Sequence, residues 1–315
     1  MTKNHIVFVF PGQGSQSVGM GKGFYDTYKI ARDVFHEASE ALGYDVAKVC
    51  FEGPKDELDK TTITQPSILT VSFAMFKCLE QEGLLPNIVA GHSLGEYSAL
   101  TCSESISFSD AVKITSIRGA LMQTAVPIGV GTMSAILGLQ RDKIDSLCAS
   151  ASGYVAPANY NCPGQVVIAG EKDAVIEVSK RAVAEGAHRA VPLAVSVPSH
   201  CLMMKEMAEE FEQRLKDIEI KTPRFDFVNN ADAMYLRDPE EIRESLVRQL
   251  YCPVLWEDSI NLISERANIF FEVGPGKVLS GLIKRTIKDC KVFSIENPEG
   301  LKGLLNELNR NPREI

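Results

Sequence analysis

The sequence predicts an α/β fold in which a larger domain with a mostly parallel sheet contains an inserted, smaller ferredoxin-like domain. Short continuous apolar runs alternate with helical patterns near both ends of the chain, as expected for strands buried on both faces of a parallel sheet. The stretch between them has the order β-α-β-β-α-β, which is the ferredoxin-like order. With 315 residues, the chain is also longer than a typical single domain. We therefore expect two domains, the larger of them discontinuous in sequence.

The first part of the larger domain is expected over residues 1–128. Its first strand is the apolar run at residues 6–10, which ends at Pro11 and is followed by a glycine-rich loop that continues to about Gly23. A second strand is expected at residues 87–91, directly before a helical pattern. The helices of this part are expected at residues 31–42, 64–79, 94–101 and 109–126.

Local residues indicate where two of these helices begin. Pro66 suits the first turn of the helix that begins near Thr64, because proline lacks the N–H that a first turn leaves unpaired. Ser109 and Asp110 are residues that can cap the N-terminus of the helix containing Arg118.

The inserted domain is expected over residues 129–198, and the larger domain resumes over residues 199–315. Alternation of strands and helices returns in that second part, so its strands should join the same parallel sheet. The inserted domain is expected to have strands at 133–138, 155–160, 165–170 and 189–195 and helices at 141–149 and 172–185. The second part is expected to have helices at 201–215, 238–250 and 277–287 and strands at 225–229 and 269–273.

Composition limits the partners and cofactors of the protein. The 33 basic and 41 acidic residues give a formal net charge of -8, which opposes binding to nucleic acid. None of the eight cysteines belongs to a CxxC pair, so neither a zinc site nor a redox dithiol is expected. The apolar runs are too short for a signal peptide or a membrane span. We expect a cytoplasmic monomer with no metal, no cofactor and no nucleic acid or membrane partner.

The candidate nucleophile is Ser93, which lies in the segment Gly91-His92-Ser93-Leu94-Gly95. The GxSxG pattern places a serine on a sharp turn between a strand and a helix, as in α/β-hydrolase-like domains. The helix N-terminus also brings the N–H of Leu94 close to a developing oxyanion. The pattern alone also fits a glycine-flanked serine in an ordinary turn, but the expected strand before it and helix after it favour the catalytic interpretation.

A serine nucleophile needs a base, and the chain has five histidines. His200 follows an expected strand and precedes an expected helix, so it should lie at the carboxyl end of a strand, where α/β sites assemble. The side chain of His92 should diverge from that of its neighbour Ser93. We therefore choose His200 as the base, against a surface or capping role. Spacing singles out no carboxylate as a third member, so a Ser-His pair oriented by a backbone carbonyl is admissible.

The glycine-rich loop after the first strand is a second candidate part of the site. The dinucleotide-binding fingerprint fails here because Ser17 occupies the position of its third glycine, and the Walker A pattern fails because Gly23 follows Lys22. A backbone N–H of Gln13 that donates to an oxyanion fits the loop better.

Motifs of one known family are spread over the chain. They are FPGQGSQ at 10–16, TQPS at 64–67, GHSLGE at 91–96, RGALMQ at 118–123, ANYNCPGQVVIAG at 158–170, PSH at 198–200 and EVGPGKVL at 272–279. In these motifs, over nearly the whole chain, the sequence resembles the bacterial malonyl-CoA:acyl carrier protein transacylases of fatty acid synthesis. The resemblance implies that Ser93 takes malonyl from malonyl-CoA and gives it to the phosphopantetheine thiol of a holo acyl carrier protein.

The resemblance also implies roles for further residues. His200 would act as general base and acid, and the backbone carbonyl of Gln249 would orient it. The backbones of Gln13 and Leu94 would form the oxyanion hole. Arg118 matches the family arginine that pairs with the free carboxylate of malonyl, for which a permanently charged, two-pronged guanidinium is suited. From sequence alone an arginine in a helix more often lies on a solvated face, and the resemblance reverses that preference.

Two other functions remain open from the residues themselves. A serine esterase or thioesterase would use the same turn, base and oxyanion hole but would give the acyl group to water, so dependence on an acceptor separates it from a transferase. A non-catalytic module that binds an acyl carrier protein would need none of Ser93, His200 and Arg118, and their presence argues against it.

Overall fold

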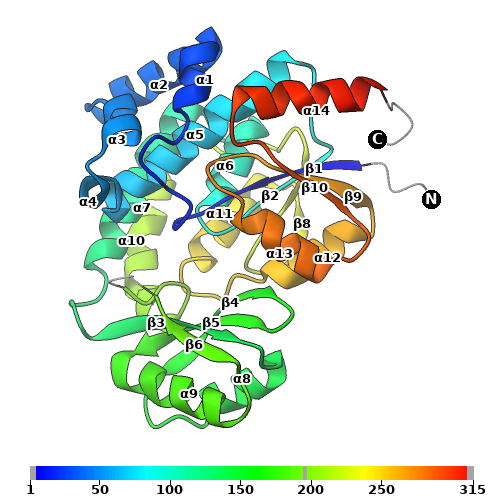
Figure 1. The fold of residues 1–315 in the computed structure, drawn as a ribbon. Coiled ribbons are helices and arrows are strands. Elements are labelled where there is room, and N and C mark those ends of the chain that lie inside the picture. Colours follow the sequence, from blue (N-terminus) through cyan, green and yellow to red (C-terminus); the bar gives the residue numbers. More distant parts are fainter. Residues whose placement is uncertain (1–4, 194–196, 311–315) are drawn as a thin grey trace.

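The computed structural model describes residues 5–193 and 197–310 and contains two sheets (Figure 1). In the larger sheet the strand order is β10 (Lys291–Ser294), β9 (Ala267–Glu272), β1 (His5–Phe10), β2 (Ile88–Gly91), β7 (Asp226–Val228) and β8 (Tyr235–Leu236). All neighbours in it are parallel except β7 and β8. The smaller sheet is antiparallel, with the order β4 (Val155–Cys162), β5 (Gln165–Glu171), β3 (Gly131–Leu137) and β6 (Arg189–Pro192). The predicted fold class is confirmed, and the last part of the strand predicted at 189–195 lies outside the described residues.

The strand β1 explains why the first apolar run is continuous. Phe8 and Phe10 pack into the core on one face of the larger sheet, and Val7 and Val9 pack into the core on the other face. Alternate side chains of a strand point to opposite faces, so a strand covered on both faces needs apolar residues at every position. The second face is covered by α12 (Trp256–Ser264) and α13 (Val278–Thr286).

The other helices of the larger domain contribute to the core on the first face. The helices on this face are α1 (Lys22–Thr27), α2 (Lys29–Leu42), α3 (Val46–Glu52), α4 (Lys55–Leu58), α5 (Thr61–Gln81), α6 (Gly95–Cys102), α7 (Phe108–Thr124), α10 (Lys205–Leu215), α11 (Pro239–Arg248) and α14 (Pro298–Arg310). In the described part of the chain, no helix on either face is long and apolar enough to cross a membrane.

Helix α5 begins earlier than predicted. It starts at Thr61, so Pro66 lies inside the helix and not in its first turn. Proline has no N–H to donate to the carbonyl four residues earlier, which is that of Thr62. The hydroxyl of Ser116 on α7 donates to this carbonyl instead, at 3.5 Å. The sequence prediction was wrong here because the replacement donor comes from another helix.

Helix α7 is capped two residues earlier than predicted. Its N-cap is Ser107, whose extended backbone lets its hydroxyl accept the N–H of Asp110 at 3.1 Å. Ser109, the predicted cap, already lies within the helix. Serine is the capping residue type that the sequence indicated, at a different position.

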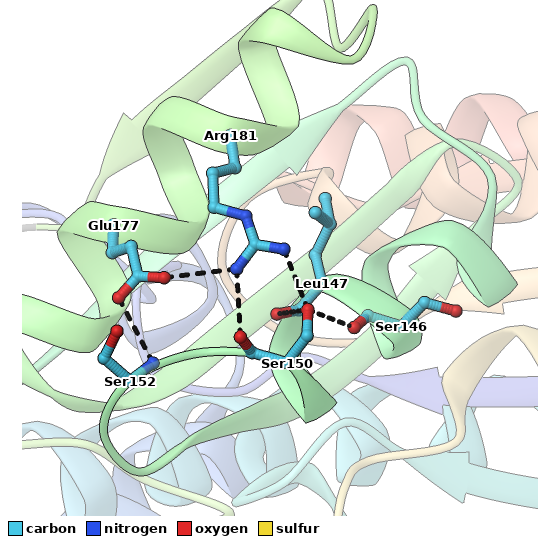
Figure 2. Close-up of polar contacts among 6 residues, drawn as sticks. All are labelled: Ser146, Leu147, Ser150, Ser152, Glu177 and Arg181. Carbon is cyan, nitrogen blue, oxygen red and sulfur yellow. Dashed lines mark hydrogen bonds and ion pairs between the residues drawn. The ribbon is translucent and has the colours of Figure 1, made fainter.

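In the smaller domain, α8 (Arg141–Ala149) and α9 (Lys172–Ala184) lie on one face of the sheet, away from the larger domain (Figure 1). Figure 2 shows that Arg181 of α9 donates to the carbonyl of Ser150, at 3.2 Å, and to its hydroxyl, at 2.8 Å. The cation thus lies at the C-terminal end of α8, where it interacts favourably with the negative end of the helix dipole. Glu177 accepts from both Arg181 and the N–H of Ser152, so the segment after α8 is bound to α9.

The buried carboxylate of Glu272 connects β9 to α13. Its two oxygens accept the N–H of Leu279 at 3.0 Å and of Ser280 at 2.7 Å, both in the first turn of α13. We expect Glu272→Gln to lower the free energy of unfolding by about 1 to 3 kcal/mol, because an amide has one acceptor oxygen and would point its NH2 at the second N–H. Urea unfolding measures this change, and an unaltered midpoint and slope would contradict it.

Candidate active site

Ser93 lies on the turn between β2 and α6. Its φ is 52°, in the left-handed region that residues with a side chain seldom adopt. The turn is also very tight: a Cβ on Gly91 would lie 1.9 Å from the backbone of Gly95, and a Cβ on Gly95 would lie 2.0 Å from the carbonyl oxygen of Phe10. Both glycines of the GxSxG pattern are therefore required by close backbone contacts. The strand, turn and helix predicted around Ser93 are all present.

Ser93 and His200 form a hydrogen-bonded pair. The Oγ of Ser93 lies 2.8 Å from Nε2 of His200, and Nδ1 of His200 lies 2.7 Å from the carbonyl oxygen of Gln249. A carbonyl oxygen only accepts, so Nδ1 carries the proton and Nε2 is left to accept the hydroxyl proton of Ser93. The pair therefore has the arrangement of a nucleophile and its base, oriented by a backbone carbonyl.

His200 lies, as its place in the sequence predicted, after a strand of the smaller sheet and before a helix. It is in the connection between β6 and the 3₁₀ helix η1 (Leu202–Met204), with a φ of 60°. Its N–H donates to the carbonyl of Leu250 at 3.1 Å. Both its backbone and its ring are thus bound to the residues that follow α11, and these contacts place His200 opposite Ser93.

The surroundings of His200 favour its neutral form. His200 is 4% exposed. The pKa of its imidazole is lowered to about 3, mainly by burial and next by the Arg118 cation, while the Gln249 carbonyl opposes the shift. His92 lowers the pKa of His200 slightly as well. The ring of His92 turns away from Ser93, since its Nε2 lies 2.8 Å from Oδ1 of Asn161. His200 is therefore available as a base throughout the neutral pH range.

This low pKa predicts acid destabilisation through His200. In the unfolded chain a histidine has a pKa near 6.5, so acidification below that value protonates the unfolded chain while His200 in the folded protein stays neutral down to about pH 3. The contribution of neutral His200 to the free energy of unfolding is thus fully present above about pH 6.5. It is lost as the pH falls toward the pKa that His200 has in the folded protein. Between about pH 7 and about pH 5 we expect wild-type to lose about 2 kcal/mol more unfolding free energy than His200→Gln. Urea unfolding at both pH values checks this, and equal losses would refute it.

Arg118 projects from α7 into the same site and is 1% exposed. Its Nη2 donates to the Oγ of Ser93 at 3.2 Å and to Oε1 of Gln249 at 2.8 Å, and its Nη1 donates to Oε1 of Gln65 at 2.8 Å. Within the described part of the chain no carboxylate forms an ion pair with it. A buried cation bound only to neutral groups is costly, so Arg118 is suited to bind an anionic group next to Ser93.

A cavity of about 520 Å³ gives access to these residues. Gln13, Ser93 and Arg118 line it from the larger domain, and Met133 and Asn159 line it from the smaller sheet. The cavity therefore lies between the two domains.

The predicted oxyanion donors lie at the two strand ends that adjoin Ser93. Gln13 follows β1 and Leu94 follows Ser93, and β1 and β2 are parallel neighbours. Among residues 5–193 and 197–310, no hydrogen bond occupies the backbone N–H of Gln13 or of Leu94. The N–H of Ser93, in contrast, donates to Oδ1 of Asn230 at 2.7 Å. Gln13 and Leu94 therefore have free N–H groups, whereas Ser93 does not.

Three fully buried residues around the site had no role in the sequence prediction: Gln65, Glu96 and Asn230. Gln65 binds Arg118, Asn230 donates to the carbonyl of Gly91 at 2.7 Å, and Glu96 accepts from the side chain of Gln249. Gln65 and Glu96 lie in the TQPS and GHSLGE motifs, which could have indicated them. Asn230 follows β7 in no recognised motif, so the sequence offered no signal for it.

Comparisons with known proteins identify the family of this chain. The family model for the acyl transferase domain matches residues 7–304. Malonyl CoA-acyl carrier protein transacylase of Salmonella typhimurium is 48% identical over 306 residues, which cover 96% of this chain and 99% of that protein. The protein of the same name from Escherichia coli K12 is 46% identical over 304 residues, or 95% of this chain and 98% of that protein.

Solved structures give the same result. An acyl carrier protein S-malonyltransferase from Vibrio cholerae has a TM-score of 0.94 and 44% identity, over 96% of this chain and all (100%) of that chain. PlMCAT, a malonyl-transacylase solved in complex with the type II PKS acyl-carrier protein AntF, has a TM-score of 0.94 and 43% identity over the same shares of both chains, 96% and 100%.

Proposed function

We propose that this chain, an acyltransferase that belongs to the family of malonyl CoA-acyl carrier protein transacylases, transfers malonyl from malonyl-CoA to the phosphopantetheine thiol of a holo acyl carrier protein. The malonyl carrier protein formed would supply fatty acid synthesis. The transfer would proceed through a malonyl ester of Ser93, in two half-reactions that use the same residues.

One observation carries the choice of malonyl. Arg118 is a buried cation whose Nη2 lies 3.2 Å from the Oγ of Ser93 and which has only neutral hydrogen-bond acceptors in the described residues. A malonyl group on Ser93 would have its free carboxylate carbon two carbons beyond the ester carbonyl carbon, within reach of the guanidinium. Two charge-assisted hydrogen bonds would then compensate the buried charge. An acetyl group has no carboxylate and would form neither of these hydrogen bonds.

In the first half-reaction, Nε2 of His200 accepts the proton of Ser93 while Oγ attacks the thioester carbonyl carbon of malonyl-CoA. The carbonyl oxygen becomes an oxyanion, to which the N–H groups of Gln13 and Leu94 donate. The intermediate then collapses as the carbon–sulfur bond breaks, and His200 gives its proton to the leaving thiolate of CoA. The products are free CoA and malonyl-Ser93.

In the second half-reaction the steps reverse with a new thiol. His200 accepts the proton of the phosphopantetheine thiol as its sulfur attacks the ester carbonyl. The same two N–H groups stabilise the oxyanion, and collapse breaks the bond to Oγ. His200 returns the proton to Ser93, which restores the free enzyme. The carbonyl of Gln249 keeps the ring in the tautomer that both half-reactions need.

Intact-mass spectrometry of a purified holo acyl carrier protein tests the proposal. After incubation with malonyl-CoA and the wild-type enzyme, we expect the carrier protein to gain the mass of one malonyl group, and we expect no gain with Ser93→Ala or His200→Ala. Omitting the carrier protein separates a transferase from a thioesterase, because only a thioesterase would release CoA continuously without it. A carrier protein whose mass does not change with the wild-type enzyme would overturn the proposal.

A further inference from the structure

The carboxylate of Glu96 is buried behind the candidate site and takes no part in the chemistry described above. It lies in the first turn of α6 with 0% exposure. One of its oxygens accepts the backbone N–H of Asn230, and the other accepts Nε2 of Gln249. In the described part of the chain no lysine or arginine forms an ion pair with it. Glu96 is therefore an acceptor for two neutral donors.

The side chain of Gln249 connects Glu96 to both Arg118 and Ser93. Its Nε2 donates to Glu96 and, at 2.9 Å, to the backbone carbonyl of Ser93. Its Oε1 accepts from Nη2 of Arg118 at 2.8 Å. The residue is fully buried. This amide thus contacts the nucleophile's turn and the guanidinium at once, in addition to the contact of its backbone carbonyl with His200.

We propose that Glu96 is a positioning residue for malonyl selection, because its carboxylate fixes the orientation of the Gln249 amide and through it the guanidinium of Arg118. A carboxylate can only accept, so the NH2 of Gln249 must face Glu96 and its oxygen must face Arg118. In the opposite orientation the amide oxygen would meet the carboxylate, and the NH2 would meet the N–H donors of Arg118. Both contacts would be repulsive, so the carboxylate excludes that orientation together with Arg118 and the Ser93 carbonyl.

The indirect contact between Glu96 and Arg118 has a second consequence. Glu96 is close enough for the cation to act on it: burial raises the pKa of the Glu96 carboxyl to about 8, while its two donors and Arg118 oppose that rise. Both of its oxygens face N–H donors, as those of an ionised carboxylate do, so the geometry favours the charged form despite that rise. Because the Gln249 amide lies between the two charges, the carboxylate does not itself occupy the guanidinium. Arg118 is thereby partly compensated in the free enzyme, yet it can still form two hydrogen bonds to a substrate carboxylate.

The Glu96→Gln variant tests this proposal, which rests on the proposed malonyl transfer. The introduced amide would have one acceptor oxygen for two donors, so its NH2 would face either Asn230 or Gln249. Where it faces Gln249, the two NH2 groups would repel each other and displace the Gln249 amide from the position in which it contacts Arg118. We expect the ratio of kcat/KM for malonyl-CoA to that for acetyl-CoA to fall about tenfold or more, because acetyl makes no use of Arg118. A general loss of structure would lower both values together, and an unchanged ratio would overturn the proposal.

Glu272→Gln is the matched control. Glu272 is also a fully buried carboxylate with two N–H donors, but it binds the start of α13 and not the network around Arg118. We expect this variant to lose stability and to keep the wild-type ratio of malonyl to acetyl transfer. A fall in the ratio with Glu272→Gln as large as that with Glu96→Gln would show that destabilisation alone changes selectivity, and the proposal would be wrong.

Gln249→Met provides a second test in case Glu96→Gln does not fold. This variant keeps the backbone carbonyl that binds His200 but lacks the amide, so we expect a similar fall in the malonyl to acetyl ratio and no further fall when Glu96→Gln is added. An unaltered ratio in Gln249→Met would contradict the proposal.

The activity of the wild-type enzyme separates the proposed function from the role of Glu96. Failure of the wild-type enzyme to transfer malonyl refutes the proposed function. Normal wild-type transfer with unchanged malonyl to acetyl ratios in the variants refutes only the role of Glu96.

Discussion

Replacing Ser93 by alanine is expected to lower the rate of malonyl transfer by about 10⁴-fold or more, because the covalent intermediate can no longer form. His200→Ala should cause a loss of similar size, since the hydroxyl of Ser93 would lose the base that lies 2.8 Å away. The two residues act as one unit, so the double variant should be no slower than the slower single variant. The measurement is the rate at which malonyl carrier protein appears under saturating malonyl-CoA.

Binding and covalent labelling separate this prediction from a loss of folding. The Ser93→Ala protein should still bind malonyl-CoA, which calorimetry can measure, and only wild-type should gain a malonyl mass when the carrier protein is omitted. His188→Gln is a suitable control, because His188 is an exposed residue of the smaller domain. A malonyl mass on the Ser93→Ala protein would place the nucleophile elsewhere.

Replacing Arg118 by alanine is expected to lower kcat/KM for malonyl-CoA by about 10²-fold to 10³-fold, because the substrate carboxylate would be buried without its cation. Acetyl-CoA should lose much less, so the preference for malonyl over acetyl should disappear. Arg118→Lys should fall between the two, since an ammonium retains the charge but not the planar pair of donors. Steady-state kinetics with both thioesters measures these effects.

Arg141→Ala serves as the control for Arg118. Arg141 also is an arginine on a helix, but it pairs with Asp258 at 2.8 Å, between α8 and α12, and does not line the cavity. The Arg141→Ala variant should leave the preference for malonyl over acetyl unchanged.

We also expect Arg118→Ala to increase hydrolysis relative to transfer, since a malonyl group fixed by Arg118 would keep water out of line with the ester. Intact malonyl transfer with unchanged preference in Arg118→Ala would exclude Arg118 as the selector.

Local sequence patterns predicted the elements of the fold well where a single physical requirement acts on consecutive residues. The run at residues 6–10 is apolar at every position because β1 is covered on both faces. The strands and helices between residues 131 and 192 follow one another in the predicted ferredoxin-like order. The four strands pair in one sheet, with the order β4-β5-β3-β6. The predicted start of α5 was wrong, because a hydroxyl on α7 replaces the N–H donor that Pro66 lacks and the helix can begin earlier.

The sequence by itself determined the turn of Ser93, because Gly91 and Gly95 are required by contacts within a few residues and the strand and helix on either side have clear patterns. Only the tertiary structure decided what lies around that serine. His200 approaches from the connection between the domains, Arg118 from α7, and Gln249 and Asn230 from segments more than one hundred residues away in sequence. Hydrogen bonds between distant segments depend on how the elements pack, and a local pattern of residues contains no record of that packing.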